Sequence, residues 1–585
     1  MTITRTITRT NVKRFAGIRS CTVAAVMLGM LVVLCMLAPT RSQASPPNGV
    51  PESVPRSKRV VMFTDSVGLG AEFALPRAFP PEWQVVVDGA PARMVNQLLD
   101  DFVRPRLVTN PDWFGDHVII AGGYNYPYWD PARFDHEIDA MVDTLVRAGV
   151  EHVYWVTLRE IKPQYVSGAA WRQIQPYYWY FPRVNQHLED ALERHPNLSL
   201  IDWRANADQV GLTYDAIHLN NIGAALYSSI ARAEIDAAAT RVDDGSITRI
   251  HVDGGAGFAA AAVNLTTTGP RTAGFLTAFD CNGDPPTVSI HNYRRNEIVA
   301  HAGIVPLDAG GDFCVKTRVA TNLVIDVTGM IAPDRGFTAV SPTRWLDTRS
   351  VSGRAAVGAG ETVMLDFDDI RDTVGVVGDV SAFALVATAT EAAGPGWLKV
   401  LTCGTSSETS NVNYLDANPS PNFVVVTPDA DGKVCITSST RTHLVVDLFG
   451  VFTPAAEVIA DQATRVFDSR LVGGAVAAGS VTRFNIAAAG LRVDTAGAIL
   501  NLTAVNAAAP GFATAYPCAE GRPNASNLNV AGSGAVSNAA LVAPDVNGDI
   551  CVYSLSSMDL VIDVAGQIGA VFEGITPRRA LDTRG

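Results

Sequence analysis

The stretch Arg59-Val-Val-Met-Phe-Thr-Asp-Ser66-Val-Gly-Leu-Gly70 places a serine directly after a short apolar run. The four apolar residues Val60 to Phe63 predict a buried strand, and the glycines after the serine predict a turn into a helix. A serine on such a turn exposes its hydroxyl. Because a hydroxyl becomes a nucleophile only when a base accepts its proton, a histidine and a carboxylate are needed elsewhere in the chain.

Further apolar runs at 84–87, 117–121, 152–157 and 198–201 alternate with helical patterns, such as Phe134 to Ala148. This alternation predicts an α/β domain with a parallel sheet over residues 59–238.

Asp215 and His218 supply the expected partners for Ser66. Three residues of spacing let the carboxylate reach the imidazole on a loop and hold the tautomer that leaves the other ring nitrogen free as a base. Gly122-Gly-Tyr-Asn125 ends another predicted strand, and the Asn125 amide and the Ser66 backbone N–H are candidate donors to an oxyanion. The predicted catalytic residues are therefore Ser66, Asp215 and His218, and no cofactor or metal is expected.

These elements, in this order, resemble the SGNH (GDSL-like) hydrolases. Through residues 185–188, 197–203 and 215–223 the match looks closest to the esterase-like domains of cell-wall O-acetyltransferases. The resemblance implies a flavodoxin-like three-layer α/β/α fold and a second backbone donor to the oxyanion, at Ala92 or alternatively Gly89. Two positions depart from the family pattern: Thr64 replaces a glycine, and Tyr126 replaces an aspartate after the asparagine.

The predicted function is an exported serine ester hydrolase that removes or transfers small acyl groups on an extracellular carbohydrate or lipid ester. Hydrolysis is favoured over transfer because the chain shows no multi-spanning acyl-donor domain. The alternative is a non-catalytic envelope or carbohydrate-binding protein with a degenerate hydrolase domain.

Residues 1–44 have the pattern of a secretory signal, with basic residues, an apolar run from Cys21 to Leu37, and then Ser42-Gln-Ala44. An uncleaved anchor is the alternative. A Pro/Ser-rich linker follows at 45–58. The chain has a net charge of −13, and without the six basic residues of the signal the charge is −19, which disfavours nucleic acid as a partner.

Three repeats follow, predicted as all-β modules at 243–349, 350–470 and 471–585. Each contains a Gly-aromatic pair, an apolar strand ending in Asp-x-x-Gly, and a closing Arg-x-x-Asp-Thr/Ser-Arg. The Gly-aromatic pairs are Gly274-Phe275, Gly396-Trp397 and Gly511-Phe512. Because the repeat is too long for a solenoid unit or a propeller blade, independent beads are expected rather than one ring.

Each repeat also holds two cysteines, paired in sequence as Cys281 with Cys314, Cys403 with Cys435, and Cys518 with Cys551. In an exported chain this regular spacing predicts one disulfide inside each repeat. The modules are expected to hold the enzyme on a cell-wall polymer by multivalent contacts, with an inert stalk as the alternative.

Several other features have simpler structural interpretations. The Asp-rich turns before the second cysteines are expected to be hairpin turns rather than calcium loops, and the Arg-x-x-Asp-Thr/Ser-Arg ends are expected to form salt bridges. Arg159 is expected to face solvent, while the aromatic cluster 177–181 either lines a sugar-binding wall or packs a loop. Five histidines are expected to be surface or packing residues: His117, His136, His152, His187 and His195.

Overall fold

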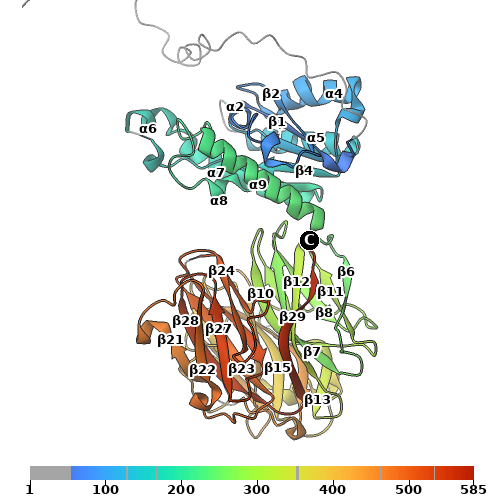
Figure 1. Cartoon of the computed structure of the whole chain (residues 1–585), viewed down its shortest axis with the longest axis vertical. Helices are drawn as coiled ribbons and strands as arrows, with labels where there is room; N and C mark the ends of the chain where they lie inside the picture. Colours follow the sequence, from blue (N-terminus) through green and yellow to red (C-terminus); the bar gives the residue numbers. More distant parts are fainter. Residues whose placement is uncertain are drawn as a thin grey trace, which may run out of the picture. The chain divides into compact units, whose positions relative to one another are not determined.

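The computed structural model describes residues 54–126, 130–166, 168–350, 355–460, 463–532 and 534–584. The predicted signal segment lies outside these residues. An α/β domain comes first and is followed by a region of antiparallel strands (Figure 1). Within the described ranges, no helix is both long enough and apolar enough to cross a membrane.

The α/β domain contains a five-stranded parallel sheet in the order β2-β1-β3-β4-β5. Its strands are β1 (Arg59–Thr64), β2 (Gln84–Gly89), β3 (His117–Ala121), β4 (His152–Val156) and β5 (Leu198–Ile201). The five strands match the five apolar runs expected from the sequence. The order is that of a flavodoxin-like sheet, in which the direction of strand addition reverses between β1 and β3 and leaves a crevice at the carboxyl ends of those strands.

The helices of this domain are α2 (Ser66–Leu69), α3 (Val95–Leu98), α4 (Arg104–Thr109), α5 (Pro131–Arg147), α6 (Gly168–Ile174), α7 (Tyr177–Arg194), α8 (Trp203–Asn206) and α9 (Asn221–Thr240). Alternate strand residues such as Val60 and Met62 pack against Tyr227 and Ile235 of α9 on one face. On the other face, α5 and α7 contact each other and the neighbouring strands β4 and β5. The domain is therefore the expected three-layer α/β/α sandwich.

The remaining strands form two four-stranded antiparallel sheets in each repeat. The first repeat contains β6 (Ile247–His251), β7 (Ala260–Thr268), β8 (Gly274–Phe279), β9 (His291–Tyr293), β10 (Val299–Pro306), β11 (Asp312–Thr317) and β12 (Asn322–Ile331). The next strands are β13 (Phe337–Asp347), β14 (Thr362–Asp366), β15 (Ala382–Thr390), β16 (Gly396–Thr402), β17 (Val412–Tyr414), β18 (Ser420–Val426), β19 (Lys433–Ser438) and β20 (His443–Phe452). The last are β21 (Thr464–Asp468), β22 (Ser480–Asn485), β23 (Gly497–Val505), β24 (Gly511–Pro517), β25 (Leu528–Val530), β26 (Ala535–Val542), β27 (Asp549–Ser554), β28 (Asp559–Ile568) and β29 (Phe572–Asp582).

The strand that ends each repeat completes a sheet of another repeat. β13 pairs with β20 of the second repeat, and β21 pairs with β28 of the third. The final strand, β29, returns to pair with β12 of the first repeat. The three repeats therefore close into one ring, and the expectation of independent beads is wrong, because a repeat on its own would lack the fourth strand of this sheet.

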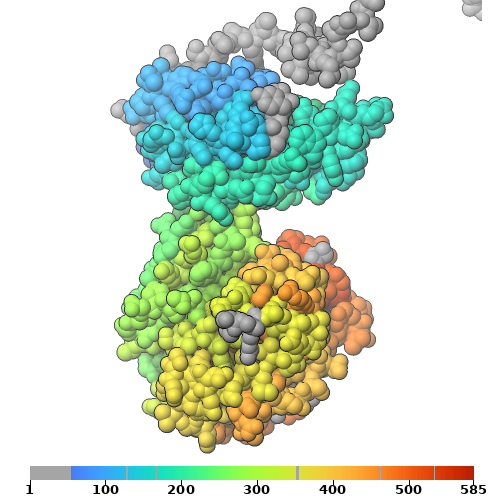
Figure 2. Space-filling model, turned by 180° about the vertical axis from the view of Figure 1, so that it is seen from behind, coloured from blue at the N-terminus to red at the C-terminus, as the bar shows by residue number. Residues whose placement is uncertain are grey.

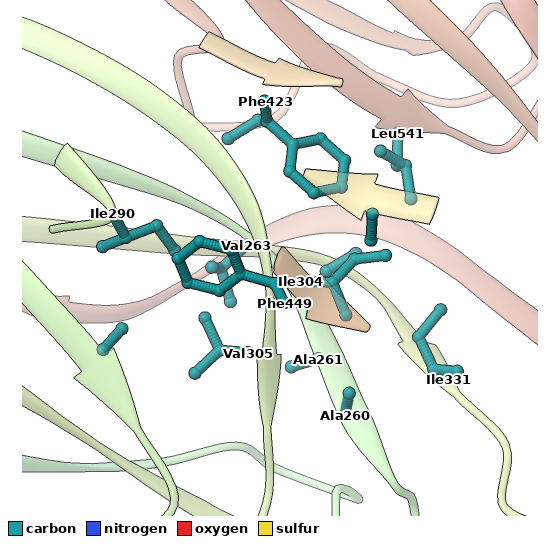
Figure 3. Close-up of a cluster of buried hydrophobic side chains, with 14 of the residues drawn as sticks. Ala260, Ala261, Val263, Ile290, Ile304, Val305, Ile331, Phe423, Phe449 and Leu541 are labelled. Atoms are coloured by element: carbon teal, nitrogen blue, oxygen red, sulfur yellow. The ribbon is translucent and has the colours of Figure 1, made fainter. Parts of the chain in front are cut away.

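The ring also shares one hydrophobic core. Ile304 of the first repeat, Phe423 of the second and Leu541 of the third belong to the same buried cluster (Figure 3). The central strands β7 and β15 are buried along their whole length, because one face packs on the strands of the same repeat and the other on the neighbouring repeats. The three repeats lie side by side, coloured green, yellow and orange to red in Figure 2.

The disulfides predicted for the repeats are confirmed. Disulfides join Cys281 to Cys314, Cys403 to Cys435, and Cys518 to Cys551. In each Asp-rich turn the first aspartate accepts two backbone N–H groups through Oδ1: Asp308, Asp429 and Asp545. The expectation of hairpin turns is wrong, because each turn joins strands of two different sheets, β10 to β11, β18 to β19 and β26 to β27.

The arginines of the repeat ends form the expected salt bridges. The last arginine of each end pairs with the aspartate of its own motif. The first arginine pairs with an aspartate on the neighbouring strand of a different repeat. Arg465 Nε lies 2.8 Å from Asp563 Oδ1, and Arg579 Nε lies 2.6 Å from Asp326 Oδ1. Arg344 pairs in the same way with Asp447. Burial raises the pKa of Asp447 to about 6 despite this arginine, so the ion pair lies at a buried seam of the ring.

Candidate active site

Ser66 stands at the carboxyl end of β1, where the strand turns into the short helix α2. Asp65 caps this helix, because its Oδ1 accepts the backbone N–H of Val67 at 3.0 Å. A Cβ at Gly68 would lie 2.1 Å from Thr64 Oγ1, so only glycine allows the turn to pack this closely on its own strand. The local sequence therefore holds the Ser66 side chain at the carboxyl edge of the sheet.

Ser66, His218 and Asp215 form a continuous hydrogen-bonded chain. Ser66 Oγ lies 3.0 Å from His218 Nε2, although the two residues are 152 positions apart in the sequence. His218 Nδ1 lies 2.8 Å from Asp215 Oδ2. When Nδ1 carries the proton that it donates to the carboxylate, Nε2 is free to accept the serine hydroxyl proton.

A tight loop holds Asp215 and His218 in this arrangement. Asp215 Oδ1 accepts the backbone N–H groups of Ile217 at 3.0 Å and His218 at 2.7 Å, and Ala216 adopts a left-handed φ of 73°. The Asn220 side chain then caps α9 by accepting the N–H groups of Ile222 and Gly223. The carboxylate is thus oriented by its own loop before it meets the imidazole.

The charges of the pair reinforce each other. Burial alone would raise the pKa of Asp215, but the hydrogen bonds from the His218 side chain and the loop N–H groups lower it to about 2. The same hydrogen bond to Asp215 raises the pKa of His218 above its usual value. The side chains of His218 and Asp215 are 44% and 50% exposed, so solvent can reach the site.

Asn125 lies beside the serine turn. Its Nδ2 donates to Asp65 Oδ2 at 2.9 Å and to the carbonyl of Arg93 at 3.3 Å. This amide therefore links the strand end after β3 to the turn after β1 and to the loop after β2. Both amide hydrogens are engaged with protein oxygens.

The two alternatives for the other oxyanion donor differ in their surroundings. Ala92 has a left-handed φ of 57° in the loop after β2, directly before Arg93. Gly89 pairs with Thr64 in the sheet, and a Cβ there would lie 1.9 Å from the Thr64 carbonyl oxygen. Gly89 is thus explained by close strand packing, whereas the loop conformation at Ala92 has no such packing reason.

Asp65 is a site residue that the sequence reasoning did not single out. Its side chain is fully buried, and burial raises its pKa to about 7 even though it accepts hydrogen bonds from the Val67 N–H and the Asn125 amide and lies near His218. The sequence signal for it is its position directly before the nucleophile in Thr64-Asp65-Ser66. It fixes the serine turn and Asn125 together.

Arg159 does not face solvent, so that expectation is wrong. The residue is 1% exposed, and its guanidinium donates to the Ala207 carbonyl at 2.9 Å, to Thr213 Oγ1 at 2.6 Å and to the Ala216 carbonyl at 3.2 Å. Because the guanidinium carries five donors in one plane, it can satisfy several carbonyl groups at once. Arg159 thus supports from behind the loop that carries Asp215.

The aromatic cluster at the start of α7 is divided between buried and exposed side chains. Tyr180 and Phe181 are buried, and Tyr180 donates its hydroxyl proton to the Gly123 carbonyl at 2.9 Å. Tyr178 and Trp179 are exposed, and Tyr178 lines a hollow of about 350 Å³ together with Glu160 and Lys162. Half of the cluster therefore packs the domain, and half stands at its surface.

The five other histidines of the domain have packing or surface partners. His117 Nδ1 lies 3.1 Å from the Tyr154 hydroxyl, and its ring stacks on His152. His187 and His195 lie within hydrogen-bond distance of Asp135 and Asp139. His136 is exposed on α5.

Comparison with known proteins identifies solved structures only. No family model and no curated protein matches the chain. The catalytic domain of Streptococcus pneumoniae peptidoglycan O-acetyltransferase A matches 30% of this chain and 91% of its own length, at 19% identity and a TM-score of 0.23. A GDSL-like lipase from Bacteroides thetaiotaomicron matches 31% and 89%, at 16% identity and a TM-score of 0.25. A lipase/acylhydrolase from Enterococcus faecalis matches 30% and 95%, at 18% identity and a TM-score of 0.23.

One of these neighbours is described as a GDSL-like lipase. Likenesses at this level leave the activity of this chain to be judged from its own residues.

Proposed function

We propose that the α/β domain is a serine ester hydrolase in which Ser66 is the nucleophile, His218 the base and Asp215 the residue that orients His218. The observation that carries this proposal is the hydrogen-bonded chain from Ser66 Oγ to His218 Nε2, at 3.0 Å, and from His218 Nδ1 to Asp215 Oδ2, at 2.8 Å. Three side chains with these roles and contacts are what acyl transfer through a serine requires.

In the first half of the reaction, His218 Nε2 takes the proton of the Ser66 hydroxyl while Oγ attacks the ester carbonyl carbon. The carbonyl oxygen becomes an oxyanion, and the imidazolium is stabilised by the ionised Asp215. His218 then gives its proton to the leaving alcohol as the C–O bond breaks, which leaves an acyl group on Ser66. In the second half, His218 activates a water molecule, and the acid and free Ser66 are released.

The oxyanion would be held by the backbone N–H groups of Ser66 and Ala92 and by the Asn125 amide. Of the two contacts that Asn125 makes, the 3.3 Å contact to the Arg93 carbonyl is the longer, so it is the one that a substrate oxygen would replace. The contact to the buried Asp65 would keep the amide in place. Removing one such donor typically costs about 3 to 4 kcal/mol of transition-state stabilisation.

We further propose that the enzyme is exported and acts on a small acyl ester of an extracellular carbohydrate, or of a lipid, with water as the acceptor. The three disulfides support an oxidising compartment. The exposed Tyr178 and its neighbouring hollow offer an aromatic surface for the alcohol part of the substrate. The ring of repeats would retain the enzyme on a cell-wall polymer.

The decisive test compares the turnover of p-nitrophenyl acetate by the mature protein and by Ser66→Ala. Turnover should fall by roughly 10⁴-fold or more in Ser66→Ala. Ser229→Ala is a matched control, because Ser229 is exposed on α9 and only hydrogen-bonds within its own helix. Equal turnover in Ser66→Ala and the wild type would refute the assignment and favour a non-catalytic binding domain.

A second experiment tests which class of ester is the natural substrate. Acetylated cell-wall polysaccharides and long-chain lipid esters are compared by kcat/KM with the wild-type protein. Preference for short acyl groups on sugars is expected, and preference for long-chain lipid esters would exclude the carbohydrate ester as the natural substrate.

A further inference from the structure

Two of the three junctions between repeats are closed by the same pair of asparagines. Between the third and first repeats, Asn538 Nδ2 donates to Asn264 Oδ1 at 3.0 Å, and Asn538 Oδ1 accepts the backbone N–H of Ala302 at 3.0 Å. Between the second and third repeats, Asn422 Nδ2 donates to Asn501 Oδ1 at 3.0 Å. Asn422 Oδ1 accepts the N–H of Ala539 at 2.9 Å. We call this arrangement the amide clasp.

The junction between the first and second repeats lacks both asparagines. The strand register identifies the equivalent positions, because Asn538 precedes the residue paired with Asn501, and Asn422 precedes the residue paired with Val386. In the first repeat the residue before the partner of Asn264 is His301. At the first junction the clasp positions therefore hold His301 and Val386, and neither can reproduce the amide pairing.

One ring nitrogen of His301 has no hydrogen-bond partner among the described residues. The residue is 2% exposed, and its Nε2 is buried without a hydrogen-bond partner among the residues described. A buried polar atom without a partner costs free energy, so its persistence in a closed ring needs an explanation. A ligand that supplies the missing hydrogen bond is one.

A hollow of about 370 Å³ lies against His301 and is lined by residues of all three repeats. Tyr293 and Tyr414 contribute aromatic rings to its wall, and Asn292 and Asn413 contribute amides. The volume falls within the range of small-molecule sites. A second hollow of about 330 Å³, between the first two repeats, shares Asn292 with it.

The wall of the larger hollow presents little uncompensated charge. Burial lowers the pKa of His301 to about 3 and that of His291 well below its usual value, so both imidazoles are neutral near neutral pH. Arg294 pairs with Asp416 at 2.8 Å. Glu297 accepts the backbone N–H of Arg294. An anionic ligand would therefore find no unpaired cation among Arg294, His291 and His301, and a purely apolar ligand would leave the amides and imidazoles unpaired.

We propose that this hollow is a binding site for one neutral sugar unit. A pyranose ring has apolar C–H faces that can pack on Tyr293 and Tyr414, and hydroxyl groups that can pair with Asn292, Asn413 and His301. The site is single because residues of all three repeats line the one hollow. The inference is independent of the esterase proposal, since its residues belong to the ring of repeats.

The test introduces the amide clasp at the junction between the first and second repeats by substitution. In the double variant His301→Asn/Val386→Asn the new asparagines should pair as they do at the other two junctions, which removes the His301 imidazole from the wall of the hollow. Wild-type protein with ¹⁵N-labelled histidine is titrated with glucose, galactose, mannose and N-acetylglucosamine, and imidazole signals are followed by NMR. At least one sugar should shift the His301 signals of the wild type. Calorimetry with that sugar should give affinity at least about tenfold weaker in the double variant, a change of roughly 1.4 kcal/mol.

Two further proteins keep the test decisive. Ser420→Trp fills the hollow from its rim without touching the clasp positions, and it should also weaken sugar binding. Ser66→Ala should bind the sugar like the wild type, so loss of esterase activity and loss of this site are distinguished. If none of the four sugars shifts the His301 signals, or if the double variant binds as tightly as the wild type, the proposal is overturned.

Discussion

The α/β domain and the ring of repeats use long-range contacts in opposite ways. In the α/β domain, each strand is followed by its own helix or loop, and single side-chain contacts such as Ser66–His218, Asn125–Asp65 and Arg159–Ala216 join distant segments at the site. In the ring, each repeat receives a strand from elsewhere, and the last strand closes the first repeat. A substitution at the site of the α/β domain should therefore alter catalysis locally. A substitution in the shared core of the ring should destabilise all three repeats.

The largest expected effect is on the local chemistry of the α/β domain. Asp215→Asn keeps the size of the side chain but no longer holds the Nδ1–H tautomer of His218, so kcat should fall by about 10⁴-fold. Asp208→Asn is the matched control, because Asp208 is exposed and pairs with Lys162 rather than His218. Kinetics with p-nitrophenyl acetate measure both variants. A loss smaller than tenfold in Asp215→Asn would show that Asp215 does not orient the base.

The next effect tests the shared core of the ring. Phe423→Ala removes a ring that is 2% exposed and should lower the free energy of unfolding by about 3 to 5 kcal/mol. Because Phe423 contacts the cluster shared by all repeats, calorimetry should show the whole ring unfolding at a lower temperature in one transition. Val377→Ala, at a residue that is 93% exposed, should leave this transition unchanged. Selective melting of the second repeat, with the others intact, would restore the bead interpretation.

A smaller effect is expected at Arg159, where the α/β domain does depend on a contact between distant segments. Arg159→Met removes the donors to the loop before Asp215 and should lower kcat by roughly 10- to 100-fold through misplacement of the catalytic carboxylate. Arg147→Met, on the exposed end of α5, is the control. Wild-type kcat in Arg159→Met, with an unchanged circular dichroism spectrum, would mean that the loop keeps its conformation without Arg159.

The smallest effect concerns pH. Protonated His218 cannot accept the Ser66 proton, so kcat/KM should rise with pH through the pKa of His218, which its hydrogen bond to Asp215 raises above the usual value of 6.5. In Asp215→Asn the residual activity should rise at a lower pH, because this stabilisation of the imidazolium is lost. A wild-type midpoint below 6.5 would contradict the assignment.

The buried Asp65 also has a pKa near this range, at about 7. Asp65→Asn therefore separates the two groups. Because the charge of Asp65 also helps to raise the pKa of His218, the rise of kcat/KM with pH should persist in Asp65→Asn with a lower midpoint if His218 titrates. The rise should disappear if Asp65 is the group that titrates.

Much of the α/β domain followed from the sequence because the relevant signals are local. Apolar runs such as Val60 to Phe63 mark strands by themselves, and the three-residue spacing of Asp215 and His218 is a property of one loop. The disulfides could also be predicted from the sequence, because the two cysteines of each pair lie within one repeat at a nearly constant separation.

Only the tertiary structure decided the features in which a residue's partner lies far away. The sequence of β29 is the same whether it pairs within its own repeat or with β12, so ring closure leaves no local mark. Arginine is usually a surface residue and aspartate is common in turns, so residue type alone does not show that Arg159 and Asp65 are buried. Their burial is visible only in the packed structure. His301 and Val386 differ from asparagine in the sequence, but the loss of the amide clasp becomes visible only where two repeats meet. The physical reason is the same in each case: periodicity and spacing report a residue's own segment, whereas burial and partner choice depend on surfaces supplied by other segments.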